Sequence, residues 1–177
     1  ATRLGDVTKT IPKALLEIAG KPFLAHQLEL LRAAGVTEVV MCIAHLADQI
    51  EAVIGDGSGF GLRVRYAHDR RGPNGELMGT GGALRDALPL LGDEFLVMYG
   101  DSYLLCDYAA IARAWQASGK WGLMTVYENH GQYDASNVDF AGGKILRYEK
   151  GGAGMHHIDW GLGAFRAEAF AGYPPGR

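Results

Sequence analysis

The chain of 177 residues has little that would tie it to a membrane, to nucleic acid or to a disulfide framework. It has no run of about 18 consecutive apolar residues, and its opening lacks the charged and apolar regions of a signal peptide. With a formal net charge of -3, it has no excess of basic side chains for binding nucleic acid. Only two cysteines occur, Cys42 and Cys106, and their apolar neighbours predict buried thiols. These absences predict a cytoplasmic protein that binds neither membranes nor nucleic acid.

Two common nucleotide-binding motifs are also missing. The sequence contains neither G-x-G-x-x-G nor G-x-x-x-x-G-K-[ST]. Glycine is nevertheless abundant, at 26 residues, and it falls between periodic segments without forming a low-complexity tract. This distribution predicts tight turns and places where the backbone approaches another group closely.

The length predicts one domain, because a chain of this size can bury roughly 70% of its unfolded surface. Apolar periodicity predicts helices over residues 23–35, 46–55, 80–91 and 107–118, and strands over residues 38–43, 62–67, 94–100 and 122–128. Alternation of this kind is typical of a parallel sheet covered by helices on both faces. Residues 136–150 then predict a hairpin that turns at Gly142 and Gly143, and residues 159–170 predict a strand that runs into a helix or turn.

Two segments carry groups that could bind a ligand: one has a carboxylate after a strand, and the other has a glycine-rich backbone before a helix. Asp101 follows an apolar strand, and the carboxyl ends of strands are the ligand-binding edge of open α/β sheets. Its carboxylate is a suitable ligand for Mg²⁺, although capping of a turn explains an aspartate here equally well. Gly79, Thr80, Gly81 and Gly82 precede a predicted helix, where backbone N–H groups favour an anion or the close approach of a ring. A simple tight turn is the alternative.

The irregular opening segment carries two cations, Arg3 and Lys13, ten residues apart. A guanidinium can bridge two phosphate oxygens, whereas an ammonium acts as a compact point charge. Together they would suit a polyphosphate. Taken alone, however, such a pair is more often a pair of solvated surface charges.

Five motifs in order resemble the sugar-phosphate nucleotidylyltransferases, the enzymes that make nucleotide sugars. The motifs are "ATRL" at 1–4, "PKAL" at 12–15 with "GKP" at 20–22, "MGTGGAL" at 78–84, "GDSYLLCD" at 100–107, and Glu149-Lys150. The variants "SNV" and "HHIDWG" are most similar to the heptose 1-phosphate guanylyltransferase branch, with hexosamine 1-phosphate or N-acetylmuramate 1-phosphate uridylyltransferases close behind. The resemblance implies a Rossmann-like α/β/α fold with a mostly parallel sheet and a small antiparallel hairpin over the sugar site.

The resemblance also implies roles for individual residues. Thr2, Arg3, Lys13 and the segment Gly79, Thr80, Gly81 and Gly82 would bind the nucleoside triphosphate, with Asp101 holding Mg²⁺ beside the α-phosphate. The sugar 1-phosphate would be bound by Asn137, Glu149, Lys150, Asp159 and Gly161. Arg3, Lys13 and Asp101 would be the catalytic residues. For Asn137, a turn-forming role is an equally good explanation.

The sequence departs from the family pattern at several points. Ala1 stands where the family usually has glycine, and Asp159 stands where it often has asparagine. The family also has an opening strand and a glycine pair before the position of Ala1, and a second metal ligand beyond the position of Arg177. We therefore expect residues 1–177 to be a single nucleotidyltransferase domain that lacks its first strand and its C-terminal portion. A catalytically silent nucleotide-sugar-binding relative and a cytidylyltransferase acting on a phosphorylated alcohol remain alternatives. The resemblance allows a homo-oligomer without defining the oligomeric state.

Overall fold

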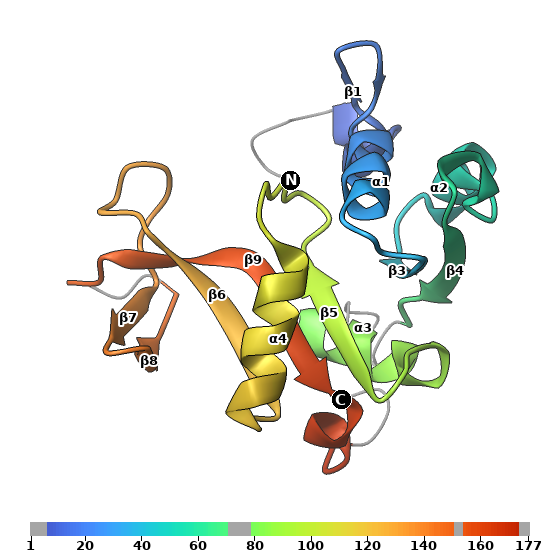
Figure 1. Ribbon diagram of the computed structural model, residues 1–177. Helices are drawn as coiled ribbons and strands as arrows, with labels where there is room; N and C mark the ends of the chain where they lie inside the picture. The colour runs from blue at the N-terminus through green and yellow to red at the C-terminus, as the bar shows by residue number, and fades with distance from the viewer. Residues whose placement is uncertain (1–6, 71–78, 151–153, 174–177) are drawn as a thin grey trace.

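The computed structural model describes residues 7–70, 79–150 and 154–173, and Figure 1 shows their arrangement. From α1 to β6, α-helices and strands alternate as the sequence pattern predicts. The helices are α1 (Phe23–Ala33), α2 (Ala47–Ile54), α3 (Gly79–Ala87) and α4 (Tyr108–Ser118), with short 3-10 turns η2 (Lys13–Leu15), η3 (Ser58–Phe60), η4 (Leu88–Leu90) and η5 (Ala167–Phe170). The strands are β1 (Glu17–Ile18), β2 (Lys21–Pro22), β3 (Glu38–Ile43), β4 (Arg63–His68), β5 (Glu94–Met98), β6 (Gly122–Glu128), β7 (Val138–Ala141), β8 (Lys144–Tyr148) and β9 (His157–Arg166).

Local chemistry explains where the main helices begin and end. The Asp107 carboxylate accepts a hydrogen bond from the Ala110 N–H, so it is the N-cap of α4 that the sequence predicts. Gly119 ends α4 in a left-handed conformation, with a φ of 63°. Such a conformation costs glycine little because glycine has no Cβ.

The strands form a mixed α/β arrangement. β3 pairs with β4 in parallel, whereas β5, β6 and β7 each pair antiparallel with β9. β7 and β8 form the expected hairpin through Gly142 and Gly143. The α/β fold class is confirmed, but the pairing among the described strands is mixed rather than mostly parallel, because β9 lies between β5 and β6 and runs against both.

Two apolar clusters stabilise the fold. One packs α1 and α2 against the β3–β4 pair and includes Leu28, Ile43 and Val64, each at most 6% exposed. The other joins Tyr108 of α4 to Leu162 of β9. Burial of such side chains contributes about 1.5–3 kcal/mol each. In Figure 1 the part that carries α1, α2, β3 and β4 stands beside the part built on β5, β6 and β9.

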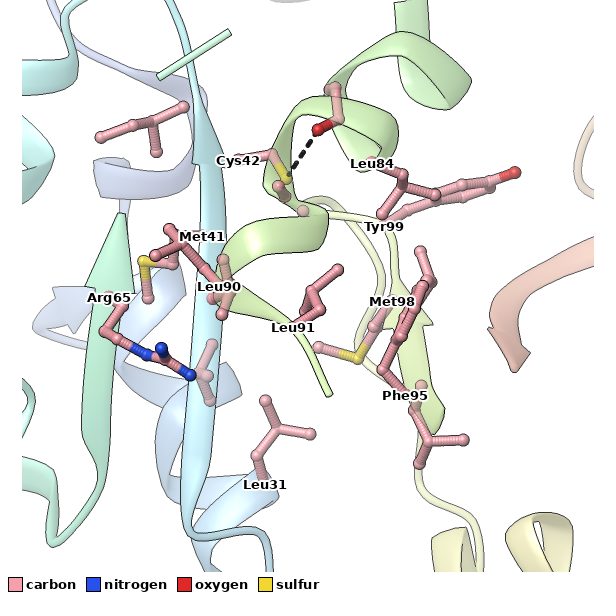
Figure 2. A pocket seen from close by; sticks show the side chains of 18 of the residues that line it. Leu31, Met41, Cys42, Arg65, Leu84, Leu90, Leu91, Phe95, Met98 and Tyr99 are labelled. Carbon is pink, nitrogen blue, oxygen red and sulfur yellow. Dashed lines mark hydrogen bonds between the residues drawn. The ribbon is translucent and has the colours of Figure 1, made fainter. Parts of the chain in front are cut away.

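An apolar cavity of about 840 Å³ lies between β3 and β5. Figure 2 shows Cys42 and Tyr99, near the carboxyl ends of the two strands, at one end of this cavity, and Leu31 and Phe95 toward the other. Among the described strands, β3 pairs only with β4 and β5 pairs only with β9. The facing edges of β3 and β5 therefore have no strand partner in the described parts of the chain.

This cavity corrects one expectation about the cysteines. Cys42 was expected to be buried, but it is exposed and lines the cavity. The reason is that one edge of β3 has no described strand beside it, so the strand is not enclosed on that side. In the described ranges, none of the helices has the length and apolar character needed to span a bilayer.

Candidate active site

Lys13 and Asp101 are brought together although they lie 88 positions apart in the chain. Lys13 Nζ donates to Asp101 Oδ2 at 2.7 Å. Lys13 belongs to η2, which packs on α1, and Asp101 lies just beyond the carboxyl end of β5. The two side chains are 44% and 56% exposed, so both can reach a ligand from solvent. Lys13 and Asp101, two of the three residues expected to be catalytic, are therefore in direct contact.

Asp101 is carried by a tight turn over residues 99–102. The Ser102 N–H donates to the Tyr99 carbonyl at 3.0 Å, which closes the turn. Gly161 of β9 lies directly beneath it, because the Tyr99 N–H donates to the Gly161 carbonyl at 3.0 Å. Gly161 has a φ of 87°, and a Cβ added there would lie 2.3 Å from Ser102 Oγ. The positive φ and the close approach to Ser102 both favour glycine here, which gives Gly161 a structural task at the site.

The beginning of α3 faces the same region. Gly79 and Thr80 line the large cavity, and Thr80 and Gly81 line a second one. A Cβ added to Gly79 or Gly81 would meet no other atom within 4 Å, so the backbone there borders open space. Gly82 is buried inside the helix. An exposed, glycine-rich helix start of this kind is suited to close contact with a flat ring or an anion.

The second cavity, of about 330 Å³, contains a cluster built on Asp159. Asp159 Oδ2 accepts hydrogen bonds from the Tyr99 hydroxyl at 2.8 Å and from the Tyr148 hydroxyl at 3.3 Å. Asp159 Oδ1 accepts from the Gly161 N–H at 2.9 Å. The carboxylate is thus held in one orientation by donors from three segments. A cavity of this size lies at the lower end of the range for small-molecule sites, roughly 300–1,000 Å³.

The two tyrosines remain protonated and therefore donate. Burial is the main cause that raises the pKa of Tyr99, and its hydrogen bond to Asp159 raises that pKa further. Burial and the Asp159 charge also raise the pKa of Tyr148. Both hydroxyls keep their protons at neutral pH, since even an unperturbed tyrosine has a pKa of about 10.

The remaining residues expected at the sugar site lie around the β7–β8 hairpin. Asn137 Oδ1 accepts from the Asp159 N–H at 3.0 Å, so the amide oxygen of Asn137 orders β9. Tyr148 at the end of β8 lines the second cavity. Glu149 is 3.5 Å from Arg147 Nη1 and its side chain is 58% exposed, and Lys150 is exposed just after it.

Thr2 and Arg3 lie outside the described residues, so their expected contacts with the nucleotide stay predictions. Within the described ranges, no group of three or more His, Cys, Asp or Glu side chains is arranged to hold a metal ion. Mg²⁺ commonly binds through one or two carboxylates together with substrate phosphates and water. The exposed oxygens of Asp101 fit that mode of binding.

Three residues of this region were missed by the sequence analysis: Gln27, Tyr99 and Tyr148. Tyr99 directly precedes Gly100-Asp101, and Tyr148 directly precedes Glu149-Lys150. Proximity to a motif was therefore a signal for both tyrosines. Gln27 gave no signal, because it lies in the middle of a helix pattern and belongs to none of the motifs.

The fold described above is one found in nucleotidyl transferases. The model of the nucleotidyl transferase family matches residues 1–135, which is well over half of the chain, so the chain belongs to that family.

Curated relatives that transfer nucleotides to sugar phosphates match as well. N-acetylmuramate alpha-1-phosphate uridylyltransferase of Neisseria meningitidis is 43% identical over 109 residues, covering 61% of this chain and 46% of that protein. Mannose-1-phosphate guanyltransferase beta-B of Xenopus laevis is 30% identical over 155 residues, covering 83% of this chain and 41% of that protein. The chain spans less than half the length of these relatives.

Solved structures agree on the fold. The crystal structure of HddC from Yersinia pseudotuberculosis superimposes with a TM-score of 0.76 at 24% identity, over 93% of this chain and 71% of that one. A UDP-glucose pyrophosphorylase complexed with UDP-glucose superimposes with a TM-score of 0.66 at 18% identity, over 96% of this chain and 74% of that one. At these identities the likeness concerns the fold alone.

Proposed function

We propose that the protein transfers a nucleoside monophosphate from a nucleoside triphosphate to a sugar 1-phosphate, releasing pyrophosphate, with Mg²⁺ as cofactor. The observation that carries this proposal is the meeting of Lys13 and Asp101 at 2.7 Å, beyond the end of β5. The glycine-rich start of α3 and the Asp159 cavity lie on the same side of β5, since Thr80 and Tyr99 line both cavities.

The proposed reaction needs few chemical groups from the protein. An oxygen of the sugar 1-phosphate is already anionic, so it attacks the α-phosphate without a strong base, and pyrophosphate leaves in line. Catalysis is then positioning and neutralisation of charge. Lys13 would supply one positive charge to the polyphosphate of the nucleotide, and Arg3 would supply a second. Bound Mg²⁺ would supply further neutralisation, with Asp101 as its protein ligand.

The sugar 1-phosphate is assigned to the second cavity. With its orientation set by Tyr99 and Tyr148, the Asp159 carboxylate would accept hydrogen bonds from sugar hydroxyls. Glu149 and Lys150 follow β8 at the edge of this region, and Lys150 would neutralise the sugar phosphate.

A pyrophosphate-release assay tests the proposal. The four nucleoside triphosphates are each combined with a panel of sugar 1-phosphates and, separately, with phosphocholine, with and without Mg²⁺. Turnover with at least one pair, and only with the divalent ion, is the expected result. Binding of a nucleotide sugar by calorimetry, without pyrophosphate release for any pair, would favour the silent binding relative. Turnover with CTP and phosphocholine alone would favour the cytidylyltransferase.

We also propose that the domain is completed by a further strand in the cavity between β3 and β5. The apolar lining supports this, as do the edges of β3 and β5, which have no partner among the described strands, and the segment that contains Ala14 opens onto the same cavity. An apolar five-residue extension before Ala1 should raise the Tm by several degrees, because each buried branched side chain contributes about 1.5–3 kcal/mol. A Gly-Ser extension of equal length is the control. An equal Tm for both would contradict the proposal.

A further inference from the structure

Gln27 is a buried polar side chain that none of the motifs explains. It lies in the middle of α1, where the pattern otherwise calls for apolar residues on the buried face, and it is only 2% exposed. A buried amide stabilises a protein only when it forms hydrogen bonds. Its partners therefore indicate what it does.

Both partners of Gln27 belong to the turn that carries Asp101. Gln27 Nε2 donates to the Ser102 carbonyl at 2.7 Å and lies 3.5 Å from the Tyr99 carbonyl. These are the two ends of the turn that the Ser102 N–H closes. Asp101 lies between these two residues, so the amide of Gln27 stabilises the backbone of the turn that carries the Asp101 carboxylate.

Of the two ends of the Gln27 amide, only the NH₂ group can form these hydrogen bonds, because both partners are carbonyl oxygens, which accept hydrogen bonds. The other end of the side chain gains nothing: Gln27 Oε1 is buried with no hydrogen-bond partner in the described parts of the protein. An unpaired buried acceptor is unfavourable. A glutamine at this position is explained if the turn of Asp101 requires the hydrogen bonds that the Gln27 NH₂ group donates.

The same helix also positions the cation of the site. η2, which contains Lys13, packs against α1, and the Phe23 N–H at the start of α1 donates to the Leu16 carbonyl at 2.9 Å. Helix α1 therefore packs against the 3-10 turn that contains Lys13 and also holds the turn of Asp101 through Gln27. The separation of ammonium and carboxylate depends on both attachments.

We infer that Gln27 is a positioning residue, which sets the place of the Asp101 carboxylate relative to Lys13. This inference rests on the proposed function. Gln27 itself touches neither carboxylate nor ammonium in the contacts described above, so it acts through the backbone of residues 99–102.

The test compares Gln27→Met, which keeps the length of the side chain but removes both N–H donors, with the wild type. Turnover should fall about 10–100-fold, since a small misplacement of a catalytic group is enough for such a loss. The Mg²⁺ concentration for half-maximal rate should rise, and the KM for sugar 1-phosphate should change less than twofold. Hydrogen exchange at the Ser102 amide should accelerate at least tenfold.

Two further variants separate positioning from loss of stability. Leu28→Val trims the core at the neighbouring residue without touching the turn, so it should lower the Tm yet keep the Mg²⁺ dependence and the Ser102 protection. Gln27→Asn keeps the amide but shortens its reach, so it should give an intermediate result even if Gln27→Met does not fold.

Wild-type turnover, Mg²⁺ dependence and Ser102 protection in the Gln27 variants, with only the Tm lowered, would overturn the inference. A wild-type protein that releases no pyrophosphate would refute the proposed function instead. In that case the exchange of the Ser102 amide would still decide whether Gln27 holds the turn.

Discussion

Asp101→Asn should separate catalysis from stability, because the proposed site depends on one carboxylate that contributes little to the fold. The substitution preserves the size of the side chain and removes its charge. In the described parts of the chain the Asp101 carboxylate pairs with Lys13 Nζ at 2.7 Å, and the side chains of Lys13 and Asp101 are 44% and 56% exposed. Ion pairs with this exposure contribute about 0–1 kcal/mol to stability. For a chain of this size, the Tm should therefore change by no more than about 2–4 °C.

The effect on turnover should be far larger. Neutralisation of transition-state charge by a well-placed group contributes about 3–4 kcal/mol, and each 1.36 kcal/mol is a factor of ten in rate. Asp101→Asn should thus slow Mg²⁺-dependent pyrophosphate release roughly 10²–10³-fold.

Asp107→Asn is the matched control, since it removes a carboxylate from the same motif six residues later. The Asp107 side chain is 65% exposed and caps α4 by accepting from the Ala110 N–H at 2.8 Å, a role that asparagine fills about as well. This variant should keep both its Tm and its rate. Near-normal turnover of Asp101→Asn, measured beside this control, would refute the assignment of Asp101.

Three other predictions concern the sugar site, the backbone and pH. Lys150→Ala should raise the KM for sugar 1-phosphate about tenfold, as expected for the loss of roughly 1.4 kcal/mol, with little change for the nucleotide; equal changes in steady-state kinetics would contradict its role. Gly161→Ala should destabilise the protein by about 1–3 kcal/mol because of its positive φ and should also lower turnover, whereas Gly59→Ala, which meets no atom within 4 Å, is the stability control in the same denaturation experiment. Arg70 lowers the pKa of Asp86 through two hydrogen bonds, so this stabilisation is present above the unfolded pKa of about 4 and is lost as the pH falls through the lower folded pKa. The Tm of Arg70→Met should accordingly lie below that of the wild type at pH 7 and converge with it in strong acid; a constant difference in Tm across that range would count against this pairing.

Much of the fold could be read from local patterns. The periodicity of residues 23–35 predicted α1, and the aspartate before residues 108–118 predicted the N-cap of α4. The paired glycines at 142 and 143 predicted the β7–β8 hairpin. Each of these features depends on interactions within a few residues along the chain, so the sequence alone contains the information. The ordered motifs predicted the family for the same reason, because each is a short local string.

The tertiary structure decided what distant segments do together. Nothing in the periodicity of residues 157–166 indicates that β9 lies between β5 and β6, since strand order depends on packing between segments far apart. The hydrogen bonds of Asp159 with Tyr99 and Tyr148 follow from that placement, as does the approach of Gly161 to Ser102. The amino-acid sequence thus determined the elements and the kinds of chemical group available, and only the folded chain decided which of those groups meet.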